Sequence, residues 1–158
     1  MKNRLDNKLG AGELSAFYYF DRQVNKMTVK IFSHSQKANT KKAIEWFTKH
    51  DVPYELYDLR QRPFLYDYFL KFLYYTEPGH LEFLSTRSKA GIALQQEIDK
   101  LTINELYNRI KSNPKLLTEP IMMDETRVLF RYQEIEMTQF LSRSQKLALF
   151  EGMSINSL

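Results

Sequence analysis

A strand, a helix and a second strand follow one another between residues 27 and 58, and this unit restricts the possible folds more than any other feature of the chain. Residues 27–32 alternate between apolar and polar side chains and are rich in β-formers, which predicts a strand. Residues 41–50 place apolar side chains at helical spacing, and Pro53 follows as a stop signal. Residues 54–58 then predict a second strand. A unit of this length favours two parallel strands joined by a right-handed crossover.

Helices are expected to fill the middle of the chain. Pro63 suits the first turn of a helix that runs to Phe72, because proline lacks the N–H that a first turn leaves unbonded. The Glu77-Pro78-Gly79 segment breaks this helix, and residues 81–84 predict another short one. A further helix is expected over residues 104–111. These elements form a helical region after the second strand.

A hairpin and a helix are expected to close the fold. Residues 120–124 and 127–131 are short β-rich runs joined by two residues, a pattern typical of a hairpin. Residues 133–141 predict a closing helix. Its inward-facing residues are expected to be Ile135, Met137 and Phe140. This order of elements predicts an α/β fold with a mixed sheet of about four strands and helices on both faces.

Composition divides the chain into three parts. The regular pattern is predicted to form one domain over residues 27–145, followed by a loosely held polar tail at 146–158, whose apolar residues would suit a helix. Residues 1–26 are predicted to be an N-terminal extension. Its polar lead, Lys2 to Gly12, is expected to be flexible, and its aromatic run, Ala16 to Phe20, is expected to pack onto the domain or onto another chain.

The sequence contains no cysteine, which excludes disulfides, thiolate nucleophiles, Cys-ligated zinc and iron–sulfur clusters. The histidines, His34, His50 and His80, lack the spacing of a helical metal site, so no metal or other cofactor is expected. The net charge of +4 permits contact with nucleic acid or an acidic protein without requiring it. No apolar run approaches the roughly 20 residues that span a bilayer, and no signal peptide is recognised, so a cytoplasmic protein without membrane contact is expected.

Four segments carry blocks of sequence that also occur in a known family. Residues 76–89 run into a Ser-Thr-Arg motif, and residues 113–124 contain the pattern Pro-x-Leu-Leu-x-x-Pro-Ile. Residues 41–53 and 124–132 agree with a first helix and a hairpin of the same family. Through these blocks, over about residues 27–145, the chain resembles the arsenate reductase (ArsC)/Spx family and is closest to its Spx branch. The resemblance implies a thioredoxin-like fold with a mixed four-stranded sheet and an inserted helical region.

The resemblance also indicates which chemistry is missing. Redox-active members carry one or two cysteines where the first strand turns into the first helix, and Lys37 and Thr40 occupy those positions here. We expect Thr40 to be a hydrogen-bonding residue at the start of the helix. Family reductases hold arsenate with arginines; Arg87 matches the motif arginine, but Glu119 stands at a position that is usually arginine, and its carboxylate would repel an oxyanion. The resemblance therefore implies no catalytic residue and no enzymatic activity.

For Spx proteins the resemblance implies binding to the C-terminal domain of the RNA polymerase α subunit, with weak or indirect DNA contact. Gly79 matches a glycine of the docking surface, Glu77 precedes it as in Spx, and Tyr74 stands where Spx has a basic residue. Close approach of a partner backbone, a positive φ angle or a helix C-cap would each explain a glycine here. Because the cysteine switch is absent, polymerase binding is expected to be independent of oxidation.

An alternative function stays open beside this one. A degenerate, catalytically inactive relative of arsenate reductase would bind a small anion or another protein in a pocket between Lys37, Thr40 and Arg87. Arg87 would otherwise hold residues 33–39 by hydrogen bonds. An ordered anion at the start of the first helix would support the alternative, and a pocket filled by side chains would count against it. The oligomeric state is also open.

Overall fold

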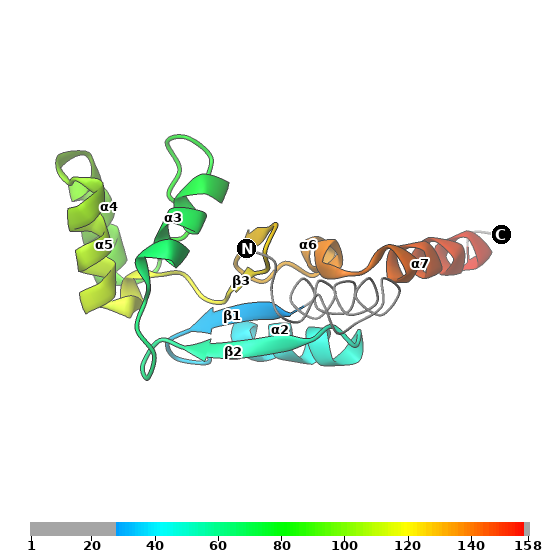
Figure 1. Ribbon diagram of the computed structural model, residues 1–158. Coiled ribbons are helices and arrows are strands. Elements are labelled where there is room, and N and C mark those ends of the chain that lie inside the picture. The colour runs from blue at the N-terminus through cyan, green and yellow to red at the C-terminus, as the bar shows by residue number, and fades with distance from the viewer. Residues whose placement is uncertain (1–27, 157–158) are drawn as a thin grey trace, which may run out of the picture.

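A four-stranded mixed sheet lies at the centre of the computed structural model, which describes residues 28–156 (Figure 1). Its strands are β1 (Val29–Ser33), β2 (Tyr54–Asp58), β3 (Ile121–Met123) and β4 (Val128–Phe130), in the order β2-β1-β3-β4. β1 and β2 are parallel, whereas the β1–β3 and β3–β4 pairs are antiparallel. The predicted α/β fold with a mixed four-stranded sheet is confirmed. The predicted extension, residues 1–26, lies outside the described residues.

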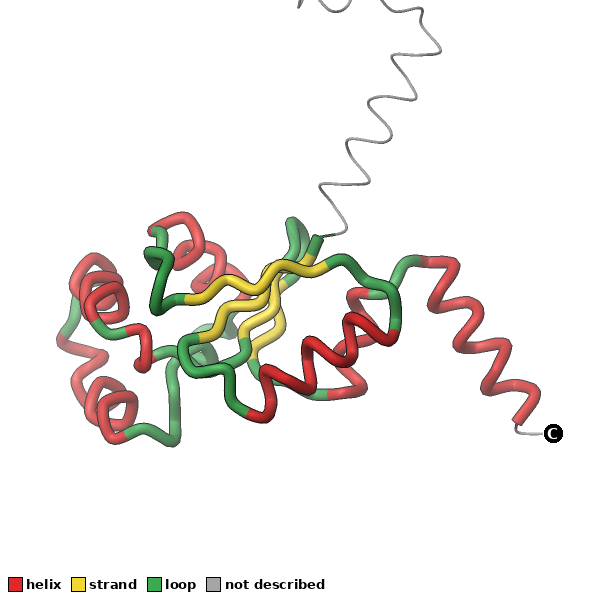
Figure 2. Tube along the Cα trace, turned by 90° about the horizontal axis from the view of Figure 1, so that it is seen from below, coloured by secondary structure: helices red, strands yellow, loops and turns green. Residues whose placement is uncertain are grey.

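Helices cover both faces of this sheet (Figures 1 and 2). In chain order the helices and 3-10 turns are α2 (Ala38–Lys49), α3 (Tyr66–Tyr75), α4 (Lys89–Glu97), η1 (Ile98–Lys100), α5 (Ile103–Ser112), η2 (Pro114–Leu116), α6 (Glu134–Met137), η3 (Thr138–Phe140) and α7 (Arg143–Asn156). On one face Ile31 and Met122 pack against Phe47 of α2 and Met137 of α6. On the other face, Phe32 joins a larger, aromatic-rich core built with α3, α4 and α5.

The start of α2 differs from the predicted boundary. The helix begins at Ala38 instead of Lys41, with Lys37 as its extended N-cap residue. Thr40 therefore lies inside the first turn, is fully buried, and is not the cap. The polar run before Lys41 hid this first turn because it lacks the apolar spacing of an amphipathic helix.

Two predicted helical segments in the middle of the chain are wrong. Pro63 precedes α3 instead of beginning it, since residues 63–65 stay non-helical and place Phe64 in the core. Residues 81–84 form a turn that leads into a bridge with Leu117. The backbone N–H of Ser85 donates to the carbonyl of Leu116 at 2.8 Å, and the N–H of Thr118 donates to the carbonyl of Phe83 at 2.8 Å, so these groups bond across the bridge and not along a helix.

The C-terminal elements also depart from the prediction. Ile135 is 85% exposed, whereas Met137 and Phe140 are buried as expected. At about 100° per residue, Ile135 lies roughly opposite Met137 on a helix, so the three cannot share one face. Helix α4 was not predicted, because Gly91 and a single large buried residue, Leu94, give it little apolar periodicity. α7 crosses the predicted boundary between domain and tail. Over the described range, none of the helices combines the length and apolarity needed to cross a membrane.

Candidate functional site

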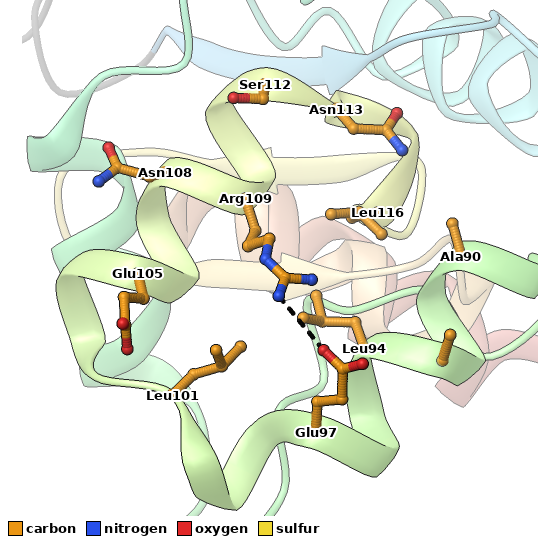
Figure 3. Close-up of a pocket in the computed structure, with 11 residues that line it drawn as sticks. Ala90, Leu94, Glu97, Leu101, Glu105, Asn108, Arg109, Ser112, Asn113 and Leu116 are labelled. Atoms are coloured by element: carbon orange, nitrogen blue, oxygen red, sulfur yellow. Dashed lines mark hydrogen bonds and ion pairs between the residues drawn. The ribbon is translucent and has the colours of Figure 1, made fainter.

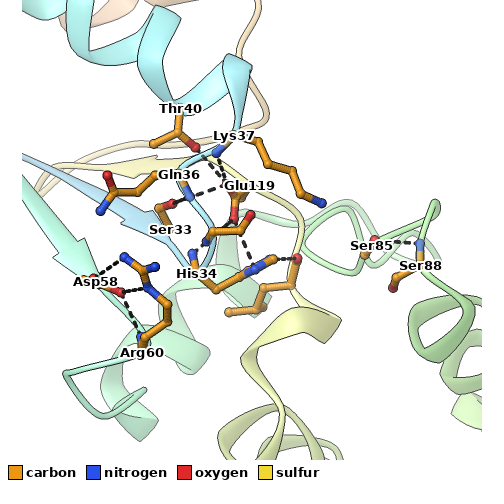
Figure 4. Close-up of polar contacts among 12 residues, drawn as sticks. Ser33, His34, Gln36, Lys37, Thr40, Asp58, Arg60, Ser85, Ser88 and Glu119 are labelled. Atoms are coloured by element: carbon orange, nitrogen blue, oxygen red, sulfur yellow. Dashed lines mark hydrogen bonds and ion pairs between the residues drawn. The ribbon is translucent and has the colours of Figure 1, made fainter.

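The loop between β1 and α2 wraps around the carboxylate of Glu119 (Figure 4). The backbone N–H groups of His34 and Ser35 donate to its Oε2 atom at 3.1 and 3.0 Å. The backbone N–H of Lys37 donates to Oε1 at 3.0 Å. These donors belong to the loop before α2 and to its N-cap residue Lys37, and backbone N–H groups that converge in this way form a concave binding place for an anion. The acceptor here is a side chain of the same protein.

Two hydroxyl groups complete the shell around this carboxylate. Ser33 Oγ and Thr40 Oγ1 donate to Glu119 Oε1 at 3.3 and 3.1 Å. Ser33 and Thr40 are themselves buried, and the Glu119 side chain is only 5% exposed. Glu119 reaches this position from the segment just before β3, where it precedes the cis peptide bond to Pro120. The carboxylate therefore occupies the place where a bound anion would lie.

Electrostatics favour the charged form of Glu119. Burial raises the pKa of this carboxyl, but the hydrogen bonds from the backbone N–H groups of Lys37 and His34, together with smaller contributions from His34 and Ser35, outweigh it, so the pKa lies below the ordinary value of 4.5. The partial positive charge at the start of α2 acts in the same direction. We expected this carboxylate only to repel an incoming oxyanion. In the structure it also accepts the hydrogen bonds of the loop N–H groups that an anion would use.

The imidazole of His34 forms one wall of this site. Its Nε2 atom lies 3.2 Å from the carbonyl oxygen of Leu117. Its buried Nδ1 atom lies 3.2 Å from Glu119 Oε2, yet forms no hydrogen bond within the described part of the chain. A carbonyl oxygen only accepts, so Nε2 is the donor in this hydrogen bond. The ring therefore closes one side of the site.

A cleft of about 680 Å³ lies outside the loop. Its lining includes four cationic residues, namely Lys37, Arg87, Lys115 and Arg131. In the described part of the chain, the guanidinium of Arg87 forms no hydrogen bond or ion pair with residues 33–39, so the expected tether from Arg87 to this loop is absent. The cleft thus brings Lys37 and Arg87 together, whereas Thr40 is buried behind it against Glu119.

The segment around Gly79 forms an exposed turn after α3. The N–H of His80 donates to the carbonyl of Glu77 at 3.0 Å, and Gly79 has a φ of +87°. Proline followed by a residue with positive φ is the pattern of a type II turn. Because α3 ends at Tyr75, with Thr76 as its C-cap, the C-cap explanation for Gly79 is wrong. A Cβ built on Gly79 meets no atom within 4 Å, so no described segment approaches it closely.

The other predicted docking residues lie on the same exposed segment. Tyr74 is 81% exposed, and Glu77 is exposed on the turn. A small groove of about 370 Å³ beside Gly79 also involves Thr86 and Arg131. The same two residues line the cleft near Lys37, and Arg131 Nη2 lies 3.4 Å from Thr86 Oγ1. The Gly79 turn and the Glu119 site are therefore separated by one shared wall.

A third hollow, of about 610 Å³, lies between α4 and α5 (Figure 3). Leu94, Leu101 and Leu116 contribute apolar surface, and the exposed ion pair between Glu97 and Arg109 crosses it at 3.3 Å. None of the predicted site residues lies there. Nor do residues 28–156 contain a group of three or more His, Asp or Glu side chains arranged to hold a metal ion.

Comparison with known proteins identifies the family. The sequence model of the ArsC family matches residues 29–140, which include both strands of the strand–helix–strand unit and the hairpin. The chain belongs to the ArsC family.

Two kinds of ArsC family relative are similar to this chain. The global transcriptional regulator Spx of Streptococcus mutans is 36% identical over 118 residues, which cover 75% of this chain and 86% of that protein. The Spx protein of Lactiplantibacillus plantarum is 36% identical over 115 residues, 73% of this chain and 87% of the relative. Among solved structures, an ArsC family related protein from Bacteroides fragilis has a TM-score of 0.62 at 15% identity, over 73% of this chain and all of the other. An arsenate reductase from Vibrio cholerae has a TM-score of 0.56 at 14% identity, over 73% and 97%. The two structures establish the thioredoxin-like fold alone.

The sequence did not reveal that Glu119 lies inside the loop between β1 and α2. Glu119 was recognised as a departure from the family pattern, and its role as an acceptor for loop residues 33–37 and for Thr40 was not foreseen. The sequence does contain a signal for this contact. A carboxylate precedes Pro120, and two residues with hydroxyl groups, Ser33 and Thr40, stand at either end of the segment in which the first strand turns into the first helix. The contact joins residues 79 positions apart, and only the fold brings them together.

Proposed function

We propose that this ArsC family chain is a transcription regulator that binds the C-terminal domain of the RNA polymerase α subunit through the turn at Gly79. The observation that carries this proposal is the similarity to proteins named global transcriptional regulator Spx, at 33–36% identity over about three quarters of the chain. Weak or indirect DNA contact belongs to the same proposal. The cations of the cleft suit a phosphate backbone, and one of them, Arg131, also lines the groove beside Gly79.

The surface around Gly79 supports a docking role. The turn projects from the end of α3, and its backbone is open to close approach because Gly79 carries no side chain. Tyr74 adds an exposed aromatic ring, which contacts Tyr75 edge-on at a centroid distance of 5.1 Å. Tyrosine combines apolar area with a hydroxyl and is enriched at protein interfaces. An aromatic contact at Tyr74 would replace the basic one expected in Spx.

Regulation of this binding would not involve a thiol. The sequence has no cysteine, so neither a disulfide switch nor thiol-dependent reduction of arsenate is chemically available. The loop at the start of α2 is instead held by Glu119, through contacts that do not change with redox state. We infer a binding protein without enzymatic activity.

Titration of the purified full chain against the isolated α C-terminal domain tests the proposal. Binding should have the same affinity with and without dithiothreitol, and Gly79→Arg should weaken it at least tenfold. Gly79→Ala is the matched control, because it imposes the same strain at positive φ with little added bulk, and it should retain binding. No detectable binding of the unchanged chain at tens of micromolar would contradict the proposal, as would equal loss in both variants.

Small-anion binding in the cleft is the second candidate function. The four cations around the cleft favour it, whereas the Glu119 carboxylate counts against it by occupying the N–H donors of the loop before α2. Titration with phosphate or arsenate, followed by NMR of the backbone amides of residues 34–40, separates the two. Saturable shifts at millimolar or lower concentration would favour the anion site, and unchanged spectra would leave the docking proposal alone.

A further inference from the structure

Arg131 has a backbone conformation that suits glycine better than arginine. Its φ angle is +75°, in the left-handed region, where a Cβ atom meets steric resistance. Two other residues with side chains have a positive φ in the described part of the chain, and each has a local explanation. Asp51, at +53°, follows the C-cap residue of α2. Gln36, at +48°, donates its N–H to Ser33 Oγ within the loop around Glu119. Arg131 follows β4 directly and belongs to neither motif.

The backbone of Arg131 is held in place by the sheet. Its N–H donates to the carbonyl of Pro120 at 3.0 Å, next to the last pair of the β3–β4 ladder, Ile121 and Phe130. This bond uses only backbone atoms, so a glycine would satisfy it equally and with less strain. Strained residues gather where a side chain is needed in a particular place. The strain at Arg131 therefore indicates a use for its side chain.

The guanidinium of Arg131 has little to bind inside the protein. Arg131 is exposed, and its Nη2 atom lies 3.4 Å from the hydroxyl of Thr86, which is a long contact with a neutral group. Within residues 28–156 it forms no ion pair with a carboxylate, whereas Arg60 and Arg109, which are also exposed, each form one. A guanidinium has five N–H donors. Most of those on Arg131 are left to water or to a bound group.

The groove beside the Gly79 turn is where this guanidinium can meet a bound group. Arg131, Gly79 and His80 all line this groove of about 370 Å³. Two exposed acidic residues, Glu82 in the groove and Glu77 on the turn, disfavour a polyanion such as a nucleic acid here. A single carboxylate on a docked protein is the better match, because a guanidinium recognises a carboxylate through two parallel N–H···O bonds.

We propose that Arg131 recognises the docking partner, and that its guanidinium pairs with an Asp or Glu side chain of the protein bound at the Gly79 turn. This inference rests on the proposed binding of the α C-terminal domain, and it adds the charge that the partner must present beside Gly79. The paired hydrogen bonds fix the orientation of the partner in addition to strengthening its binding. A residue selected for such a contact explains why the chain keeps a strained arginine where glycine would fit.

Calorimetric titration of the full chain with the isolated α C-terminal domain tests this pairing. Arg131→Gln should weaken binding at least tenfold, because it leaves the partner's carboxylate desolvated without its cation. Lys115→Gln is the matched control, since Lys115 lines the cleft but not the groove beside Gly79, and it should change the affinity less than twofold. Arg131→Gly should lose the same affinity without lowering the melting temperature, because it removes the strain at positive φ.

The results distinguish a failure of this pairing from a failure of the proposed docking. Equal affinities of Arg131→Gln and the unchanged chain would overturn the pairing and leave docking at Gly79 standing, whereas no binding of the unchanged chain would overturn both. Equal losses in Arg131→Gln and Lys115→Gln would overturn it in favour of general charge attraction. Weaker binding of duplex DNA with unchanged affinity for the protein would overturn it in favour of a phosphate contact. A melting temperature lowered by more than about 2 °C in Arg131→Gly would show instead that the arginine stabilises the fold.

Discussion

The loop at the start of α2 and the turn at Gly79 lie on either side of the Thr86–Arg131 contact. The polar groups of the loop are buried and bonded within the protein, whereas the turn is exposed. At the start of α2, three backbone N–H groups and two hydroxyls point inward to the buried carboxylate of Glu119. At the turn, Tyr74, Glu77 and Gly79 are all exposed, and nothing in the described chain covers the glycine.

This difference separates a site closed by the protein itself from a surface left open. Backbone N–H groups that converge on one point attract an anion, and in this loop the internal carboxylate of Glu119 occupies them. An exposed turn with positive φ has no such internal partner and remains available to another molecule. The comparison predicts that changes at Glu119 alter stability, whereas changes at the Gly79 turn alter binding.

The largest effect is expected from Glu119→Ala. Loss of the carboxylate leaves buried donors on Ser33, Thr40 and the loop backbone without their acceptor, which should lower the free energy of unfolding by about 2–4 kcal/mol. Urea unfolding of the two proteins measures the difference. Glu77→Ala at the exposed turn is the control and should change the free energy by less than about 0.5 kcal/mol. Equal effects at both positions would remove the contrast.

Acidification should reveal the same carboxylate by another route. The pKa of Glu119 in the folded protein lies below 4.5, so its stabilising contribution is present above that pH and is lost as the pH falls through the folded-state pKa. The unfolding free energy of the unchanged protein should therefore fall more steeply below about pH 4.5 than that of Glu119→Gln.

A second carboxylate provides the control for this pH experiment. The pKa of Glu55 is also lowered, by hydrogen bonds from Arg62 and Lys30, but its side chain is 40% exposed. Exposed ion pairs contribute little, so Glu55→Gln should change the pH profile less than Glu119→Gln. A Glu119→Gln profile parallel to that of the unchanged protein would show that the buried hydrogen bonds do not stabilise the charged form.

Local patterns predicted the sheet and much of the Gly79 turn because both depend on neighbouring residues. Alternation of apolar and polar side chains predicted β1, short β-rich runs predicted the hairpin, and Glu77-Pro78-Gly79 indicated a break after α3. The bounds of β2 match the prediction, residues 54–58. The role of Gly79 at positive φ was among the explanations considered, since proline and glycine favour a type II turn from their own geometry.

The Glu119 site was less predictable because it depends on contacts distant in sequence. Thr40 was expected to begin the helix, but its hydroxyl instead bonds to a carboxylate 79 positions away. Residues 81–84 were expected to be helical, but bonds from Phe83 and Ser85 to residues 116–118 hold them in a turn that ends at the bridge residue Leu84. Tertiary hydrogen bonds decided both cases against a local preference.

A smaller effect on stability is expected from Gly79→Ala. A φ of +87° disfavours any residue with a Cβ, so the variant should lose about 1 kcal/mol although the built Cβ meets no atom within 4 Å. Gly152 is the matched control, since its Cβ also meets no neighbour but its position is helical. Gly152→Ala should stabilise α7 slightly. Thermal unfolding compares the two variants, and a loss at Gly152 equal to that at Gly79 would show that backbone strain is not the cause.

The smallest effect on stability, and the sharpest separation from Glu119, is expected from Tyr74→Ala. The Tyr74 ring is 81% exposed and contacts the neighbouring ring of Tyr75, so its removal should change the free energy of unfolding by less than about 0.5 kcal/mol. Affinity for the α C-terminal domain should nevertheless fall about tenfold, because an exposed tyrosine that becomes buried at an interface is typically worth more than 1 kcal/mol. Calorimetric titration measures the affinity, and Tyr66→Ala, at a less exposed position of the same helix, controls for a general loss of aromatic surface. Affinity unchanged in Tyr74→Ala but reduced in Tyr66→Ala would move the docking surface away from Gly79 and along α3.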